Sequence, residues 1–149
     1  MKPASPIIDA DFSRGSVLSD RCPSRKVLTH VTSRWGILLL VALKDGQNHR
    51  FSDLRRTIKG ISEKMLVASL QHLESDGFVL RTPFPVTPPH VEYSLTPMGM
   101  EIASHVVTLV DYIEGRIFDI LDAQENYRAE KASPKLAERK LVRPGHFCR

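Results

Sequence analysis

Residues 51–99 read FSDLRRTIKGISEKMLVASLQHLESDGFVLRTPFPVTPPHVEYSLTPMG, in which two short helical patterns precede a strand-like pair. Ser52 can cap the first helix, and Gly60 can end it because glycine tolerates the left-handed conformation found after a last helical turn. Phe78–Leu80 and Val91–Leu95 fit two strands joined across the proline-rich tip FPVTPPH. This order predicts a winged helix-turn-helix, whose second helix can lie in a DNA major groove while the strand pair reaches the flanking backbone.

The second helical pattern, which begins after Ser62, is the candidate reading helix. Its apolar residues are predicted to face the core, and they are Met65, Leu66, Leu70 and Leu73. Its predicted outward residues are Glu63, Lys64, Val67, Ala68, Gln71 and Ser75. Lys64 and Gln71 can read base edges or phosphates, and the small apolar pair can touch thymine methyl groups. The alternative for Val67 and Ala68 is an indifferent surface position.

The residues before this stretch predict an arm and two helices. Residues 1–20 mix Pro, Ser, Gly and Asp and are expected to form an arm, because such a composition buries little. A helix that begins at Pro23 would present the apolar stripe Val27, Leu28 and Val31. Ser33 can cap a second, buried helix that runs to the Asp45-Gly46 turn. In that helix, Trp35 is interpreted as a core anchor, with ligand stacking as the alternative.

A long amphipathic helix is predicted after the strand pair, because Thr96-Pro97 has the form of an N-cap and first turn. Apolar residues then recur at four- and three-residue steps, at Ile102, Val106, Leu109, Ile113, Ile117 and Ile120. Val107, Val110, Phe118 and Leu121 widen this stripe beyond what a small lobe can cover. We therefore expect the helix to pack against the same helix of a second subunit, in a homodimer.

Periodicity fades after Asn126, and residues 127–149 are expected to form a basic, flexible tail. The predicted organisation is an arm at 1–20, a DNA-binding and dimerisation domain at 21–126 and the tail at 127–149. The fold class expected is mainly α with a small β wing, a winged helix-turn-helix with a long C-terminal dimerisation helix.

The formal net charge of +4 is unevenly distributed. Residues 21–81 carry 11 Lys or Arg against 5 Asp or Glu, whereas residues 82–126 carry Arg116 alone against seven acidic residues. Residues 127–149 add 7 basic and 2 acidic residues. Basic side chains near phosphates release counterions and supply non-specific affinity for DNA, so the first block is the candidate footprint. A solvated charged face is the alternative.

Polar and small residues of this block and of the wing are the candidate contacts to double-stranded operator DNA. The predicted set is Arg34, Arg50, Ser52, Arg55, Ser62, Lys64, Val67, Ala68, Gln71, Thr87 and His90. The arginines are candidates for phosphate contacts. The wing prolines lower the entropy lost when Arg81, Thr87 or His90 meets a phosphate or the minor groove. For His90, simple exposure to solvent is the alternative.

Composition argues against several other classes of protein. A chain of 149 residues that is 42% hydrophobic fits one soluble domain. No apolar run approaches the roughly 20 residues needed to span a bilayer, so a cytoplasmic protein with no membrane partner is expected. Cys22 and Cys148 lack paired spacing, the histidines lack metal-ligand spacing, and no phosphate loop or nucleophile elbow is present. We therefore expect no enzyme activity, no metal and no cofactor.

From Cys22 through about Leu121, the sequence resembles the HxlR family of bacterial winged-helix transcriptional regulators. The residues that carry the resemblance are Cys22-Pro23, Arg34-Trp35, 51–56, 60–62, Leu70, Leu73-Glu74, Asp76-Gly77, Pro88-Pro89, 91–97 and Gly99. The resemblance implies a dimer that binds operators, and a response to oxidants or electrophiles through the cysteine matching Cys22. One departure is Val67-Ala68-Ser69, where relatives usually have a polar set such as Ser/Thr-Gln-Arg. This departure suggests an altered operator preference.

Cys22 is the candidate redox-sensing residue. Arg21, Arg25 and Lys26 surround it, and the positive end of the predicted helix after it also favours the reactive thiolate. Oxidation would give a sulfenic acid, and then a mixed disulfide or a bridge between subunits. The alternative is a cysteine retained for packing. Cys148 is a candidate resolving partner, with an incidental tail thiol as the alternative.

Two further functions remain open at this stage. The first is a repressor controlled by a small-molecule effector, bound in a pocket between the long helix and the winged lobe, with a structural Cys22. The second is a protein-interaction module that does not bind DNA. Steeply salt-dependent binding to DNA would separate the regulators from the module.

Overall fold

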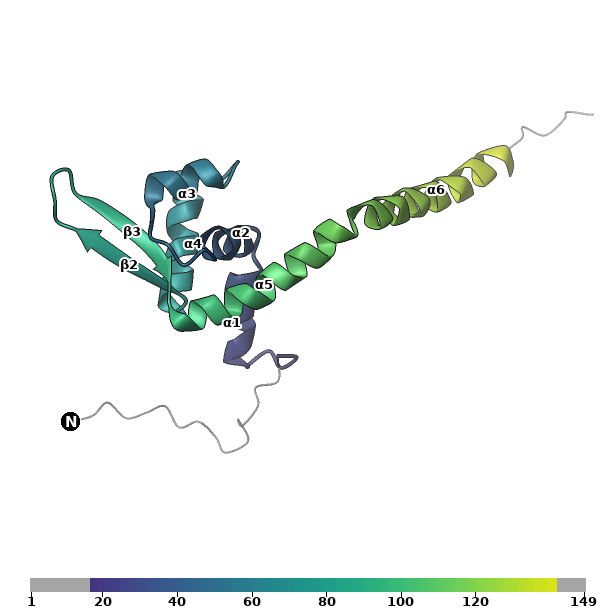
Figure 1. Ribbon diagram of the computed structural model, residues 1–149. Helices are drawn as coiled ribbons and strands as arrows, with labels where there is room; N and C mark the ends of the chain where they lie inside the picture. The colour runs from purple at the N-terminus through teal and green to yellow at the C-terminus, as the bar shows by residue number, and fades with distance from the viewer. Residues whose placement is uncertain (1–16, 142–149) are drawn as a thin grey trace, which may run out of the picture. The chain divides into compact units, whose positions relative to one another are not determined.

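The computed structural model describes residues 17–141, and their side chains as far as residue 133 (Figure 1). Most of the predicted arm, and Cys148 in the predicted tail, lie outside the described residues. The elements in chain order are α1 (Pro23–Thr32), α2 (Arg34–Leu43), β1 (His49–Arg50), α3 (Phe51–Thr57), α4 (Glu63–Ser75), β2 (Val79–Phe84), β3 (His90–Leu95), α5 (Pro97–Gly115) and α6 (Ile117–Leu141). The chain divides into two compact units between Val107 and Thr108, a boundary that falls within α5.

The helices α1 and α2 are separated by a sharp turn at Ser33. Its hydroxyl accepts a hydrogen bond from the Gly36 amide at 3.1 Å, which confirms the predicted N-cap. The buried leucines of α2 form the centre of the core, and they are Leu39, Leu40 and Leu43. Leu28 was predicted to face inward but is 48% exposed, because α1 turns only Val31 fully into the lobe. Trp35 is half-buried, and the Arg34 guanidinium lies 5.5 Å from its ring centroid.

The helix-turn-helix consists of α3 and α4. Gly60 has φ +87°, which confirms its predicted left-handed turn, and Ile61 is buried beside it. The Ser62 hydroxyl accepts from the Met65 amide at 3.1 Å and caps α4 as predicted. Ser52, in contrast, does not cap α3: the N-cap position is Arg50, because the chain passes directly from strand β1 into the helix.

The inward stripe of α4 differs from the predicted one. Ser69 is only 8% exposed, whereas Met65 is 43% exposed. The core-facing residues are therefore Leu66, Ser69, Leu70 and Leu73, at steps of three, one and three. The helix is rotated slightly about its axis relative to the predicted orientation, because Leu66, Leu70 and Leu73 all become fully buried in this arrangement.

The predicted wing is present as the strand pair β2 and β3. In the described part of the chain, a three-stranded antiparallel sheet has the order β1-β3-β2. The register runs from Val79 opposite Leu95 to Phe84 opposite His90. Because β2 is an edge strand, Pro83 removes no hydrogen bond from the sheet interior. Both strands are longer than predicted, and the tip is correspondingly shorter.

The start of α5 is held against the base of the wing. The Thr96 hydroxyl donates to the Gly77 carbonyl at 2.6 Å and accepts from the Gly99 amide at 2.9 Å, so Thr96 is the N-cap as predicted. A Cβ atom on Gly99 would lie 1.9 Å from the Phe78 carbonyl oxygen, a distance that permits only glycine. This contact brings Ala103 and Val106 into the core of the winged lobe.

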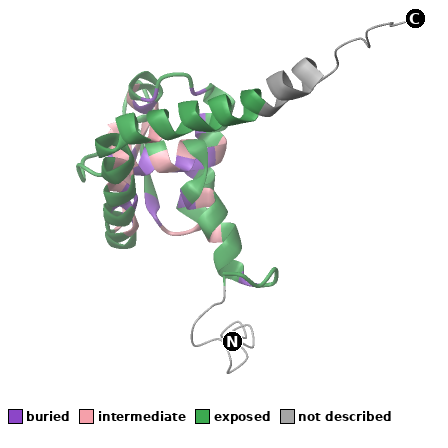
Figure 2. Cartoon of the chain, turned by 90° about the vertical axis from the view of Figure 1, so that its right-hand side faces the viewer, coloured by how far each residue is buried: buried purple, intermediate pink, exposed green. Residues whose placement is uncertain are grey.

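The predicted long helix is divided in two, because α5 ends at Gly115 and α6 begins at Ile117. Glycine is a weak helix former, which accounts for a break at this point. The helix α6 also continues to Leu141, beyond the point where the sequence pattern predicted a tail. Ala, Glu, Lys and Arg dominate this distal part and favour a helix without any apolar periodicity. In Figure 2, the first half of α6 is coloured as exposed along nearly all of its length.

The close approach at Gly99 leads to a stability prediction. Gly99→Ala is expected to lower the free energy of unfolding by about 1–3 kcal/mol, because the added methyl group overlaps the Phe78 backbone. Chemical denaturation measures the difference. Gly115→Ala is the matched control, since a Cβ there meets nothing within 4 Å, and it should stabilise the helix by up to about 1 kcal/mol. Equal stability of the two variants would contradict the assigned contact.

Candidate nucleic-acid interface

The outward face of α4 presents a short neutral and basic surface. Lys64 and Gln71 are exposed one and a half to two turns apart, with Val67 exposed and Ala68 half-buried between them. Ser69 does not belong to this face, because it is buried. The departure from the family pattern therefore presents Val67 and Ala68 outward, while Ser69 contributes to the core. We call Lys64, Val67, Ala68 and Gln71 the reading face.

The helix α3 borders the N-terminal end of this face. Arg55 lies on α3 with its Nη1 atom 3.6 Å from Glu63 Oε2, and both side chains are more than half exposed. Such a surface pair is weak, so Arg55 is free to exchange its partner for a phosphate. The neighbouring Arg56 pairs with Asp53. A hollow lined by Phe51, Ser52, Arg55, Arg56 and Glu63 lies at this corner.

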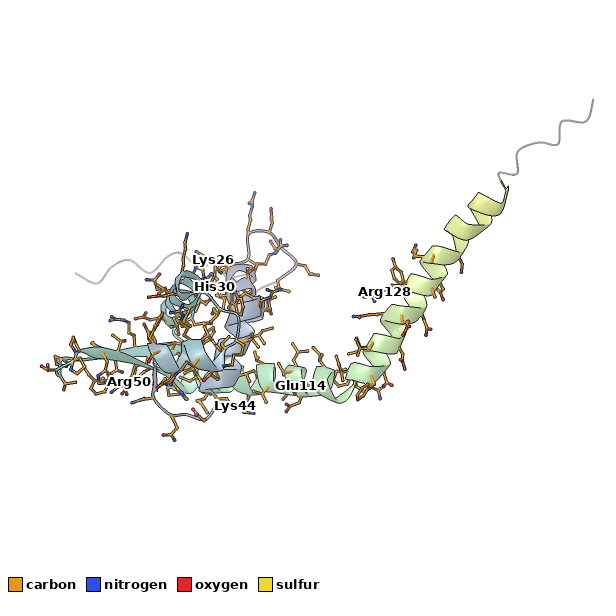
Figure 3. The ribbon with its side chains drawn as sticks, turned by 90° about the horizontal axis from the view of Figure 1, so that it is seen from above. Lys26, His30, Lys44, Arg50, Glu114 and Arg128 are labelled. Carbon is orange, nitrogen blue, oxygen red and sulfur yellow. The ribbon has the colours of Figure 1, made fainter. Side chains whose placement is uncertain are left out.

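A groove of about 460 Å³ joins the reading helix to the wing. It brings together four residues of the predicted DNA-contacting set from four different elements, namely Arg50, Ser52, Val67 and His90. Their convergence was not visible in the sequence, since α4 and β3 are separated from β1 and α3 by loops and by other elements. Figure 3 shows Arg50 beside the wing, where it pairs with Glu92 in the sheet, at a distance from Lys26 and His30 on α1. The basic block of the sequence is thus not one patch in space.

His90 is engaged within its own strand. Its Nε2 atom lies 3.2 Å from Glu92 Oε1, and its ring stacks on Phe84 with centroids 5.0 Å apart. This environment weakens the case for a phosphate contact by His90. Thr87 is exposed at the tip, where residues 82–91 contain no Lys or Arg. The exposed cation of the wing is Arg81 on β2.

A second pair of a histidine with a carboxylate joins the loop before β1 to that strand. His49 Nε2 lies 2.9 Å from Asp45 Oδ1. This hydrogen bond, assisted by the backbone amide of Gln47, lowers the pKa of Asp45 below its ordinary value. The carboxylate therefore stays ionised at neutral pH and offsets part of the positive charge near Arg50.

Cys22 is the N-cap residue of α1, as its position before the helix predicted, but its side chain is not accessible. It is 6% exposed, and its Sγ atom lies 2.7 Å from Ser24 Oγ. The thiol is therefore buried in the isolated subunit, as a cysteine retained for packing would be, and its redox-sensing role stays a prediction. A turn at residues 19–22 precedes α1, closed by a 3.2 Å hydrogen bond from the Cys22 amide to the Ser19 carbonyl.

A contact between α1 and the end of α4 was missed by sequence reasoning. His30 Nδ1 lies 2.6 Å from Asp76 Oδ2, with both side chains about nine-tenths buried. The His72 ring stacks on His30 with centroids 4.3 Å apart and planes 6° apart. No local pattern could reveal this contact, because His30 and Asp76 are 46 residues apart in the chain. It joins the helix capped by Cys22 to the reading helix.

The predicted dimerisation residues fall into two groups. Val106 is buried within the winged lobe and offers no free surface, whereas Ile102 is half-buried there. This corrects the assignment of Val106 to a subunit interface. In the second unit, large apolar side chains are exposed at Leu109, Tyr112, Ile113, Ile117, Phe118 and Leu121, with Ile120 half-buried.

Across the described residues, no cluster of three or more His, Cys, Asp or Glu side chains has the arrangement of a metal site. Within the same part of the chain, no single helix is both long and apolar enough to cross a membrane. The bent pair α1 and α2, with 70° between them, meets such a test by length and composition alone.

Comparison with known proteins agrees with this geometry. The HxlR-like helix-turn-helix family matches residues 30–119. The HTH-type transcriptional regulator YtfH of Escherichia coli is 52% identical over 122 residues, which cover 82% of this chain and 96% of that protein. The solved structure of the regulator ytfH from Salmonella typhimurium has a TM-score of 0.72 and 57% identity, and the match covers 75% of this chain and 99% of the other.

A more distant structure is that of the redox regulator HypR in its oxidized form. It has a TM-score of 0.57 and 34% identity, over 63% of this chain and 96% of that one. Residues 30–119, which match the family, include α2, the helix-turn-helix, the wing and α5. The chain therefore belongs to the HxlR-like helix-turn-helix family and is a transcriptional regulator of the helix-turn-helix type.

Proposed function

We propose that this regulator binds operator DNA as a homodimer, with the reading face of α4 in the major groove and the wing along the adjacent backbone. The observation that carries the proposal is the groove beside α4, where Arg50 and Ser52 lie next to Val67 and the wing. Lys64 and Gln71 supply a cation and an amide for phosphates or base edges, and the apolar pair fits thymine methyl groups. A dimer bound across a promoter would act as a repressor by excluding polymerase.

The exposed apolar side chains of the second unit support the dimer. Leu109, Ile113 and Ile117 continue the stripe of α5 after its first half has been buried in the lobe. Exposed apolar patches of this kind mark surfaces that pack against another protein. A symmetric pair would set two reading helices about 34–36 Å apart, the spacing of successive major grooves.

Thiol control through Cys22 is a second proposal. The printed description of HypR as a redox regulator in an oxidized form gives it support from a relative. Within this chain, α1 begins at Cys22 and reaches α4 through His30 and Asp76. A change at the N-cap thiol can therefore reach the reading helix. Because the thiol is only 6% exposed, an oxidant or electrophile can reach it only after a local opening at the start of α1. A small-molecule effector with a structural Cys22 is the competing mechanism.

Substitutions on the reading face test the DNA-binding proposal. Gln71→Ala is expected to cost about 1–3 kcal/mol of binding and to relax sequence preference, whereas Lys64→Ala should weaken all sequences and reduce the salt slope by about 1. Fluorescence anisotropy with a duplex from upstream of the protein's own gene, over a range of salt concentrations, measures the affinity and its salt slope. Gln47→Ala and Lys26→Ala are controls away from α4. If the parent shows no salt-dependent binding, the chain is an interaction module and the proposal fails.

The dimer proposal predicts the effect of a charged residue in the exposed apolar surface. Phe118 is 80% exposed, and Phe118→Glu combined with Ile113→Glu is expected to yield folded monomers that bind the operator at least about tenfold more weakly. Sedimentation velocity gives the mass, and denaturation of the winged lobe shows that it is intact. Glu114→Gln is the matched control on the same helix. A variant that stays dimeric would place the interface elsewhere.

For the thiol proposal, operator release by diamide is compared between the parent and Cys22→Ser. The parent should release DNA and Cys22→Ser should retain it, because only the thiol reacts. Cys148→Ser is the matched control and should respond as the parent does. Equal release by the parent and Cys22→Ser would remove Cys22 from the mechanism and favour a non-covalent effector.

A further inference from the structure

The first residue of α4, Glu63, places an exposed carboxylate at the N-terminal end of the reading helix. Its side chain is 67% exposed. In helix-turn-helix proteins, the N-terminal residues of the recognition helix are the ones that contact base edges. Glu63 stands four residues before Val67, so the two lie on the same side of α4, about 6 Å apart along its axis. The predicted DNA-contacting set contained no acidic residue and therefore missed it.

Glu63 is held more loosely than other carboxylates of the basic block. That block contains five Asp or Glu. Asp76 lies 2.6 Å from a histidine of α1, Asp45 lies 2.9 Å from a histidine of β1, and Asp53 pairs with an arginine of its own helix. The Glu63 carboxylate lies 3.6 Å from Arg55, which is longer than a hydrogen bond. It can therefore exchange Arg55 for another donor.

Duplex DNA offers this carboxylate one favourable and one unfavourable neighbour. In the major groove, the N4 amino group of cytosine donates a hydrogen bond that a carboxylate can accept. Phosphates repel it. The hollow of about 450 Å³ at this corner is lined by Arg55 and Arg56 but also by Glu63, so a phosphate there would meet negative charge beside the two cations. Glu63 therefore lowers affinity wherever no base donor faces it, and penalties of this kind are a source of specificity.

We propose that Glu63 is a specificity-determining residue, whose carboxylate accepts a hydrogen bond from the amino group of a cytosine in each operator half-site. On other sequences, the unmatched carboxylate opposes phosphates and keeps Arg55 paired. The inference rests on the proposed function, because the reading face must lie in the major groove. The competing role is structural: an acidic residue in the first turn complements the dipole of α4, and its pair with Arg55 joins α3 to α4.

The test compares the full-length parent, Glu63→Gln and the matched control Glu74→Gln by fluorescence anisotropy over a range of salt concentrations. Glu74 is exposed on the same helix, about 16 Å further along its axis, which exceeds the Debye length of about 10 Å at 0.1 M salt. One duplex is taken from upstream of the protein's own gene, and a second has the same composition in scrambled order. Further duplexes replace each G·C pair of the first by A·T in turn.

Glu63→Gln is expected to bind the scrambled duplex about fivefold more tightly than the parent, since the released Arg55 can meet a phosphate. Its salt slope should be steeper by about 0.9, the value for one added phosphate contact. At one G·C pair in each half-site, replacement should weaken the parent on the order of tenfold and Glu63→Gln by about twofold or less. Glu74→Gln should follow the parent in both measurements. A less stable fold cannot produce this gain of affinity.

Unchanged binding of the scrambled duplex by Glu63→Gln would overturn the inference and leave the structural role, as would a profile of base preferences equal to that of the parent. An equal gain by Glu74→Gln would also overturn it, because net charge alone would then explain the result. If the parent itself shows no salt-dependent binding to the upstream duplex, the proposed function fails and the inference falls with it.

Discussion

The close contact between the Phe78 backbone and the first turn of α5 holds the winged lobe together. The Phe78 carbonyl accepts from the Thr96 amide at 3.0 Å, while the Phe78 amide donates to the Leu73 carbonyl at 2.9 Å. One residue thus ties the end of α4 to the start of α5, at the point where β2 begins. Gly99 permits the approach because any side chain there would overlap the Phe78 carbonyl.

This constraint also fixes the reading helix at its C-terminal end. The Ser62 cap and the Gly60 turn hold its N-terminal end, and the His30–Asp76 contact adds a side-chain bond at the other. A helix held at both ends presents its outward residues without a large entropic loss on binding. The reading face can therefore be small, with one cation and one amide at its ends and the apolar pair between them.

Features set by neighbouring residues could be predicted from the sequence. The caps at Ser33, Ser62 and Thr96, the turn at Gly60 and the strand pair each depend on a few adjacent side chains. The orientation of α4 could not be predicted, because Met65 and Ser69 lie at opposite edges of the same stripe and tertiary packing decides between them. Ser52 was misplaced for a similar reason: the pairing of β1 with a distant strand moves the helix start to Phe51.

The candidate site was predicted in its residue types more than in its geometry. Lys64, Val67 and Gln71 are exposed on α4 as expected, but the grouping of Val67 with Arg50 depends on a groove between elements far apart in sequence. The burial of Cys22 is likewise a property of the folded lobe that charge counting does not register. Charge patterns indicate which partner a chain attracts, whereas burial decides which side chains meet it.

The division of α5 between two roles explains how dimerisation and lobe stability can be separated. Its first half buries Ala103 and Val106 in the winged lobe, and its second half leaves Leu109 and Ile113 exposed. Each such side chain contributes about 1.5–3 kcal/mol when fully buried, so a partner surface would gain several kcal/mol from the second half alone. The lobe does not need that gain, because its own core is complete before Thr108. In the proposed dimer, a change in the exposed half would therefore act on assembly, and through the spacing of the reading helices on DNA binding, while the fold of each lobe would be kept.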